Sequence, residues 1–172
     1  MNKLVETLIN LIQSHTPLLY WTQSLWRDEA FSVWIAKDGI QQTIVRTSGD
    51  FNPPLYYILL SIWMSLFGNS EVALRGLSVM AFLLFLIVVY RFSRILFRSQ
   101  KAAVYTTLLM LTNPMLVYFA FELRMYSLLI LFTTLSMYML YVANWKWYII
   151  SAVLGLYTQP FMAFVILSQS VY

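Results

Sequence analysis

Two acidic side chains stand next to each other in the segment SLWRDEAFS, between strongly hydrophobic parts of the chain: Asp28 and Glu29. Holding a carboxylate where a helix leaves a membrane costs free energy, so such a pair marks a functional site by default. A base at this place could take the proton of an acceptor hydroxyl while a new bond forms. The alternative is a capping charge, because acidic residues also stabilise the first turn of a helix.

A second charged group interrupts a long uncharged stretch in the segment FELRMY, at Glu122 and Arg124. The planar guanidinium of Arg124 is suited to phosphate oxygens, which it can bind through two parallel hydrogen bonds. Glu122 could bind a metal ion, orient an acceptor or hold Arg124. The alternative is an ordinary polar turn between two membrane helices with a local ion pair.

A third candidate is Arg75, which follows Glu71 by four residues. This arginine could neutralise a phosphate, or it could pair with Glu71 across one helical turn. Of these two interpretations we favour the ion pair.

The composition is that of an integral membrane protein. Of the 172 residues, 60% are hydrophobic and 10% are charged, whereas soluble domains have about 45–50% apolar and about 25% charged residues. There is no cysteine, which excludes disulfides and thiolate metal sites. Motifs typical of nucleotide-driven pumps, dinucleotide enzymes and common hydrolases are missing. The net charge of +4 reflects one basic segment near the membrane, and we expect no nucleic-acid partner.

Four stretches have roughly the 20 apolar residues that a membrane helix needs, and Asn113-Pro114 and Gln159-Pro160 should bend two of them. The stretches are 76–97, 102–121, 125–143 and 148–170. Residues 1–24 form at best a weak first span, because several polar residues interrupt 4–21. Either this segment is partly interfacial, or the natural start of the protein is not represented.

The orientation follows from a basic cluster between the first two of these stretches. By the positive-inside rule this short loop is cytoplasmic, and Lys146 marks a second cytoplasmic turn. The loop contains Arg91, Arg94, Arg98 and Lys101. Parity then places the Asp28 loop, Arg75 and the Glu122 turn together on the outer side.

The outer loop 25–70 should contain two surface helices. Residues 54–67 would extend about 21 Å as a helix, which is short for a span. Asn52 could cap this helix, with Pro53 in its first position and Gly68-Asn69 at its end. A shorter helix should run from about Leu25 to Lys37. For it we predict Ser24 as the cap, Gly39 as the terminator, and a shared apolar face of Phe31, Trp34 and Ile35.

The predicted fold is therefore all-α: a polytopic transmembrane helical bundle with two juxtamembrane helices in the first outer loop. All connections after residue 70 are short, so we expect residues 1–172 to form a single membrane domain, with four transmembrane helices over 71–172.

The ordered set of motifs resembles the N-terminal membrane module of GT-C glycosyltransferases. The closest likeness is to the dolichyl-phosphate-mannose–protein mannosyltransferase type and its bacterial relatives, which include aminoarabinose transferases. It runs from about residue 24 to 165 and rests on SLWRDEAFS, DFNPPLYYILLSIWMSLFGNSEVALRGLS, NPMLVYFAFELRMYSLLILFTTLSMYML and WYIISAVLGLYTQPF.

The resemblance implies an enzyme of the bacterial inner membrane or its equivalent, with its active site outside the cytoplasm. Such enzymes pass a sugar from a polyprenyl-phosphate donor to a hydroxyl on a protein, lipid or glycan acceptor, with inversion. Membrane lipids would be further partners. The resemblance establishes no cofactor, and a divalent cation is one candidate.

The resemblance also implies roles for particular residues. Asp28 matches the catalytic acidic residue and Glu29 its supporting neighbour, while Glu122 joins them as a catalytic candidate. Arg124 and Arg75 would hold the donor phosphate. Asn52 and Tyr126 would bind substrate; many relatives have His at the position of Asn52, and Thr-His-Tyr where this chain has Thr158-Gln159-Pro160.

Two rival interpretations belong to other classes. A transporter or channel would place charged or broken helices at mid-membrane depth, whereas the charges predicted here lie at helix ends and in loops. A non-catalytic scaffold or truncated pseudoenzyme would keep the same fold. Since the relatives add further helices, the chain has the character of an incomplete N-terminal part of a longer enzyme.

Overall fold

The computed structural model describes residues 21 and 23–171, and all regular structure within that part of the chain is helical. The all-α prediction is therefore confirmed, whereas most of the weak first span predicted for 1–24 lies outside the described residues. The helices are α3 (Arg27–Ala36), α4 (Ile40–Thr47), α5 (Leu55–Phe67), α6 (Glu71–Phe97), α7 (Gln100–Thr112), α8 (Pro114–Phe121), α9 (Tyr126–Tyr141), α10 (Trp145–Thr158) and α11 (Met162–Gln169).

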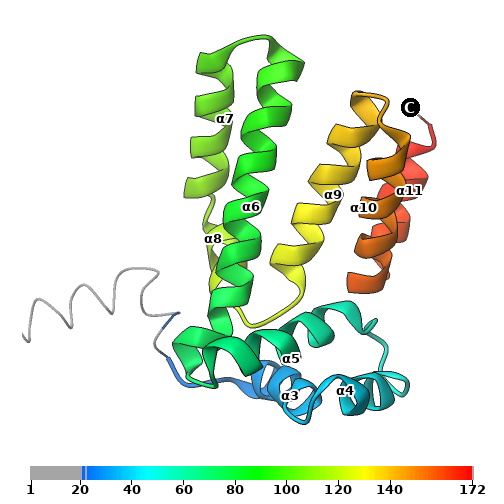
Figure 1. The fold of residues 1–172 in the computed structure, drawn as a ribbon. Helices are drawn as coiled ribbons and strands as arrows, with labels where there is room; N and C mark the ends of the chain where they lie inside the picture. Colours follow the sequence, from blue (N-terminus) through cyan, green and yellow to red (C-terminus); the bar gives the residue numbers. More distant parts are fainter. Residues whose placement is uncertain (1–20, 22, 172) are drawn as a thin grey trace, which may run out of the picture.

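The helices form two groups (Figure 1). The short helices α3, α4 and α5 pack on one another and lie across one end of the molecule, while α6 to α11 stand upright on them. Buried side chains from both groups form one core, in which Ile35 of α3 and Leu60 of α5 meet Leu74 of α6 and Leu128 of α9. This packing holds the start of α3 against the lower ends of the upright helices.

One helix within the described residues, α6, is long and apolar enough to cross a membrane by itself. The bent pair α7 and α8 passes the same test if it is counted as one span, with a bend of 62°. The break lies at Asn113, whose side chain accepts hydrogen bonds from the backbone N–H groups of Met115 and Leu116 at 3.0 and 3.2 Å. The bend predicted at Asn113-Pro114 is thus confirmed, since Pro114 begins a new helix.

The other two predicted spans, 125–143 and 148–170, do not correspond to single long helices in the structure. Helix α9 has 16 residues, or about 24 Å, which is short for an untilted crossing. The segment 148–170 is not one bent helix: α10 ends at Thr158, and α11 begins at Met162 and returns alongside α9, where Gln169 donates to Ser136 at 2.9 Å (Figure 1). The prediction of a single span there is wrong, and the polytopic bundle is not confirmed.

The reason for this reversal is local. A residue that precedes proline is driven out of the helical region by the proline ring. Gln159, before Pro160, accordingly has the extended values φ −159° and ψ 139°. Helix α10 therefore ends before Gln159, and α11 begins at Met162 in a new direction.

The loop 25–70 has three helices instead of the predicted two. Helix α4 was missed; it starts directly after Gly39, which has a φ of 86° and is the N-cap of α4. Gly39 is not the predicted terminator of α3, because α3 ends at Ala36 with Lys37 as its cap. The cap of α3 is Trp26 and not Ser24. On α3 the predicted apolar face is divided, because Ile35 is buried whereas Phe31 and Trp34 stack on each other at the surface.

Helix α5 begins at Leu55, one residue after the start of the predicted segment 54–67 and two after the predicted first position at Pro53. Pro54 occupies its cap position, so Asn52 does not cap it and Pro53 is not its first residue. Its end is as predicted, with Gly68 at a φ of 84°.

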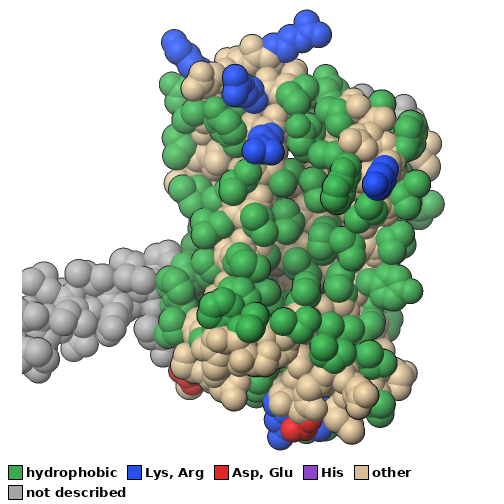
Figure 2. All heavy atoms as spheres, in the orientation of Figure 1, with side chains coloured by type: hydrophobic (Ala, Val, Ile, Leu, Met, Phe, Trp, Pro, Cys, Tyr) green, Lys and Arg blue, Asp and Glu red, His purple; other side chains and the backbone are tan. Residues whose placement is uncertain are grey.

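The surface separates apolar and charged side chains. Hydrophobic side chains cover the middle of the face shown in Figure 2, and basic side chains gather at the end that contains the α6–α7 and α9–α10 turns. The acidic residues of the described part all lie at or near the opposite end, in α3 to α5, the start of α6 and the α8–α9 turn: Asp28, Glu29, Asp38, Asp50, Glu71 and Glu122.

Candidate active site

A buried ion pair connects α3 to α6. The Arg75 guanidinium donates to both carboxylate oxygens of Glu29, from Nε at 3.0 Å and from Nη2 at 2.6 Å. Both side chains are at most 1% exposed. Nη1 donates to the backbone carbonyls of Trp21 and Gln23 at 3.0 and 2.7 Å. The predicted pair between Arg75 and Glu71 is therefore wrong, because Arg75 turns inward to Glu29.

The Glu29 carboxylate also holds the α8–α9 turn. Its Oε1 accepts the backbone N–H of Leu123 at 2.9 Å, and its Oε2 accepts that of Trp26 at 3.4 Å. One side chain thus joins the start of α3, helix α6 and a turn more than ninety residues away. Since its oxygens are engaged by these donors, Glu29 is suited to positioning its neighbours.

Asp28 presents the accessible carboxylate of the adjacent pair. Its side chain is 45% exposed, and Oδ2 lies 2.9 Å from Nη1 of Arg124. The guanidinium of Arg124 also lies over the Tyr126 ring, 5.7 Å from the centroid. Burial lowers the pKa of Arg124, but Tyr126 and Asp28 outweigh this effect and raise it, so the side chain stays charged.

Glu122 is the third carboxylate, and its environment differs from both others. It is 6% exposed, and Oε2 has no hydrogen-bond partner within the described part of the chain. Burial raises its pKa to about 7; Arg124 opposes this shift, whereas Glu29 and Asp28 add to it. Glu122 can therefore gain or lose a proton near neutral pH. It forms no ion pair with Arg124, which contacts Glu122 through its backbone N–H at 2.8 Å.

Residues before and within α5 complete this region. The Tyr57 hydroxyl donates to Oδ2 of Asp50 at 3.4 Å, and burial together with Asp50 raises the pKa of Tyr57. The charge of Arg124 and a side-chain hydrogen bond with Asn52 both oppose this rise in the pKa of Tyr57, which places Asn52 next to the cluster. Sequence reasoning missed Asp50 and Tyr57, although they flank the Pro53-Pro54 motif that was singled out.

The structure thus brings together the residues predicted for the site, although they come from four separate segments. A metal site is a different matter: among residues 21 and 23–171, no group of three or more histidine or acidic side chains could hold a metal ion. What the arrangement offers is one accessible carboxylate, one partly buried guanidinium and one buried carboxyl that titrates near neutrality.

Comparison with known proteins adds the family. Residues 52–172 match the family model described as dolichyl-phosphate-mannose-protein mannosyltransferase. The match includes Arg75, Glu122 and Arg124, whereas Asp28 and Glu29 precede it. No curated protein and no solved structure matches the chain. Because the matched residues make up more than half of the chain, it belongs to the dolichyl-phosphate-mannose-protein mannosyltransferase family, whose members are membrane-associated glycosyltransferases of the GT-C type.

Proposed function

We propose that this chain carries the part of a membrane glycosyltransferase that contains the catalytic base and the binding site for the donor phosphate. The enzyme would move a sugar from a polyprenyl-phosphate donor to an acceptor hydroxyl on the extracytoplasmic side, with inversion. The observation that carries the proposal is the ion pair of Asp28 with Arg124, in which an accessible carboxylate oxygen and a guanidinium nitrogen lie 2.9 Å apart.

In the proposed reaction the acceptor oxygen attacks the anomeric carbon of the donor. The bond from that carbon to the phosphate oxygen breaks, and polyprenyl phosphate leaves with the electron pair. Asp28 takes the acceptor proton, for which its exposed carboxylate is suited. Arg124 stabilises the negative charge that develops on the phosphate. Polyprenyl phosphate is a good leaving group, so the reaction requires no nucleotide.

The other residues have supporting roles in this proposal. Glu29 and Arg75 position Asp28 and the 122–124 turn, since their own polar atoms are occupied within the protein. This differs from the phosphate-binding role expected for Arg75. Glu122 would orient the acceptor, and its raised pKa allows it to donate or accept a hydrogen bond. Asn52 and Tyr126 would contact the substrates beside this cluster.

The proposal includes an arrangement in the membrane. Helix α6, the bent pair α7–α8 and α9 would cross the bilayer, and α10 with α11 would enter it as a hairpin. The basic α6–α7 turn would face the cytoplasm. The helices α3 to α5 would then lie along the outer membrane surface. There the bilayer would hold a lipid-linked donor next to Asp28, which reduces the entropy cost of bringing donor and base together.

The test is a donor panel in membranes that express the complete gene. Labelled sugars are supplied either on polyprenyl phosphate or as nucleotide sugars, with endogenous polyprenyl phosphate depleted. We expect transfer to membrane or protein acceptors from at least one lipid-linked sugar and none from the nucleotide sugars. Absence of transfer from every lipid-linked sugar, with the protein correctly inserted, would reject the proposal, and so would direct use of a nucleotide sugar.

A further inference from the structure

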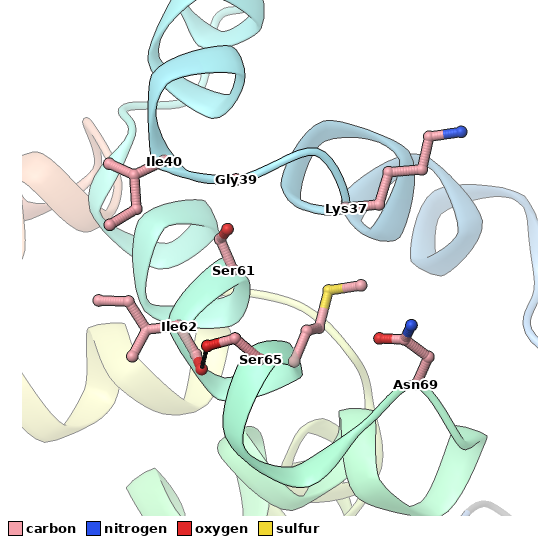
Figure 3. A pocket seen from close by; sticks show the side chains of 8 residues that line it. Lys37, Gly39, Ile40, Ser61, Ile62, Ser65 and Asn69 are labelled. Carbon is pink, nitrogen blue, oxygen red and sulfur yellow. Dashed lines mark hydrogen bonds between the residues drawn. The ribbon is translucent and has the colours of Figure 1, made fainter.

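A polar cavity outside the candidate active site lies where the α3–α4 turn faces the second half of α5 (Figure 3). Its volume is about 430 Å³, which is within the range of small-molecule sites. Three separate segments line it: the α3–α4 turn with the first residue of α4, then α5, and the α5–α6 turn. The side chains that matter here are Lys37, Ile40, Ser61, Ile62, Ser65 and Asn69.

Ser61 offers this cavity a hydroxyl that has no partner among the described residues. Helical serines and threonines usually donate to a carbonyl one turn earlier, as Ser65 does to Ile62 at 2.6 Å. The Ser61 side chain is only 7% exposed and makes no such bond within the described residues. In Figure 3 its hydroxyl points from α5 toward Gly39. Because the Ser61 hydroxyl oxygen is not fully buried, it is open to the cavity, where a ligand oxygen can bond to it in place of water.

Lys37 offers an unneutralised positive charge. Lys37 lines the cavity, and in Figure 3 its side chain extends away from the other lining residues. No acidic residue in the described part of the chain pairs with it. The lysine stem is long and flexible, so the charge can reach an anion bound at the cavity mouth.

The opposite side of the cavity is apolar. Ile40 and Ile62 lie together across from Lys37 and Asn69 in Figure 3, and these two isoleucines are 45% and 40% exposed. Leu66, one turn beyond Ile62, continues this exposed apolar strip along α5. A soluble polar ligand would leave the strip in contact with water, whereas an acyl chain would cover it.

We propose that this cavity binds the headgroup of an acidic phospholipid that carries free hydroxyls, such as phosphatidylglycerol. The phosphate pairs with Lys37, a headgroup hydroxyl bonds to Ser61, and an acyl chain follows Ile40 and Ile62. A soluble polyol phosphate has the same polar chemistry but lacks the chain.

This site is independent of the proposed transferase reaction. Lys37 follows Asp28 by nine residues on or just after α3, which corresponds to about 14 Å along the axis and half a turn around it. The lipid therefore occupies a different face of α3 from the carboxylate that we assign as the base.

The test uses the full-length protein in amphipol, which leaves no detergent micelle to compete for lipid. Calorimetric titration compares dihexanoyl phosphatidylglycerol, dihexanoyl phosphatidylcholine and glycerol 3-phosphate. We expect phosphatidylglycerol to bind at least about tenfold more tightly than either of the others. Only phosphatidylglycerol combines a net negative headgroup for Lys37 with an acyl chain for Ile40 and Ile62. Equal binding of phosphatidylcholine, or binding of glycerol 3-phosphate that matches phosphatidylglycerol, would overturn the proposal, and so would no binding at all.

Variants locate the site. Lys37→Gln should weaken phosphatidylglycerol binding about tenfold and Ser61→Ala several-fold, through loss of the charge-assisted and the neutral hydrogen bond. Lys146→Gln, at the opposite end of the molecule, is the charge control and should bind as the wild type does. Asp28→Asn should also bind normally, which separates this proposal from the transferase reaction. Unchanged binding in Lys37→Gln would contradict the assignment.

Discussion

Two adjacent carboxylates have opposite environments in this protein. Glu29 is buried against Arg75 and the backbone of Leu123, whereas Asp28 faces outward beside Arg124. The adjacency and the unusual location of the pair were visible in the sequence. Their division of roles was not, because the partners lie 46 and 94 residues further along the chain. Neighbouring positions on a helix point about 100° apart, so one side chain faces the core while the next is free.

Loss of the Glu29 charge should destabilise the protein strongly. Glu29→Gln leaves the Arg75 guanidinium buried without a counter-ion, which costs about 3–5 kcal/mol in comparable buried pairs. Asp28→Asn is the matched control, since a half-exposed ion pair contributes about 0–1 kcal/mol. Thermal denaturation of the solubilised protein should show a large drop in midpoint for Glu29→Gln and little change for Asp28→Asn. Similar midpoints for the two variants would mean that Glu29 does not hold these segments together.

Glu122 should make stability depend on pH. Because burial raises its pKa from 4.5 to about 7, the folded protein holds this proton more tightly than the unfolded chain does. The resulting stabilisation is complete below about pH 4.5 and is lost as pH rises through about 7. We expect Glu122→Gln to reduce the fall in melting temperature between about pH 5 and pH 8. A wild-type profile that the substitution leaves unchanged would show that Glu122 has an ordinary pKa.

At the scale of elements, turn chemistry was a better guide than apolar length. Asn113-Pro114 and Gly68 mark helix ends in both the sequence analysis and the structure, whereas Gly39, predicted to end α3, opens α4. The apolar stretch 148–170 suggested one span because composition alone does not report a reversal of direction. Helix α4 was missed because its eight residues mix apolar and polar side chains without a strong flanking motif.

The α10–α11 hairpin should depend on a glycine. A Cβ at Gly155 would lie 2.7 Å from Cγ of the fully buried Met162, so the hairpin can close tightly only without a side chain there. Gly155→Ala should cost about 1–3 kcal/mol through overpacking. Gly49→Ala is the control, because the nearest atom to its Cβ would be 4.0 Å away. Thermal denaturation that ranks the two variants equally would contradict the close contact of α10 with α11.

For the whole molecule, the two ends of the upright helices differ in the charges that they carry. The α6–α7 and α9–α10 turns carry only basic charges, and the three carboxylates of the candidate site lie at the other end. The sequence predicted that Asp28 and the Glu122 turn share one end, and the 2.9 Å contact of Asp28 with Arg124 agrees with it. The number of membrane crossings could not be predicted equally well, because it depends on how the helices pack and on where the chain reverses direction, as it does between α10 and α11.

Cysteine labelling can test this arrangement, because the chain has no native cysteine. Ala30→Cys, exposed on α3, should react with an impermeant maleimide added outside intact cells. Lys146→Cys, exposed at the start of α10, should react only after the membrane is opened. Labelling of both positions from the same side would reject the proposed topology.

The central claim is that Asp28 is the base of a sugar transfer at the outer end of this molecule. The most direct measurement is the rate of transfer from the preferred polyprenyl-phosphate sugar in Asp28→Asn, compared with Asp38→Asn in the same loop. Asp38 is an exposed aspartate that pairs with Arg46 and lies outside the cluster. Our account predicts a loss of at least about a hundredfold for Asp28→Asn, as general-base catalysis contributes about 10²–10⁴, and near-normal transfer for Asp38→Asn. Equal rates in the two variants, with both proteins folded and inserted, would contradict it.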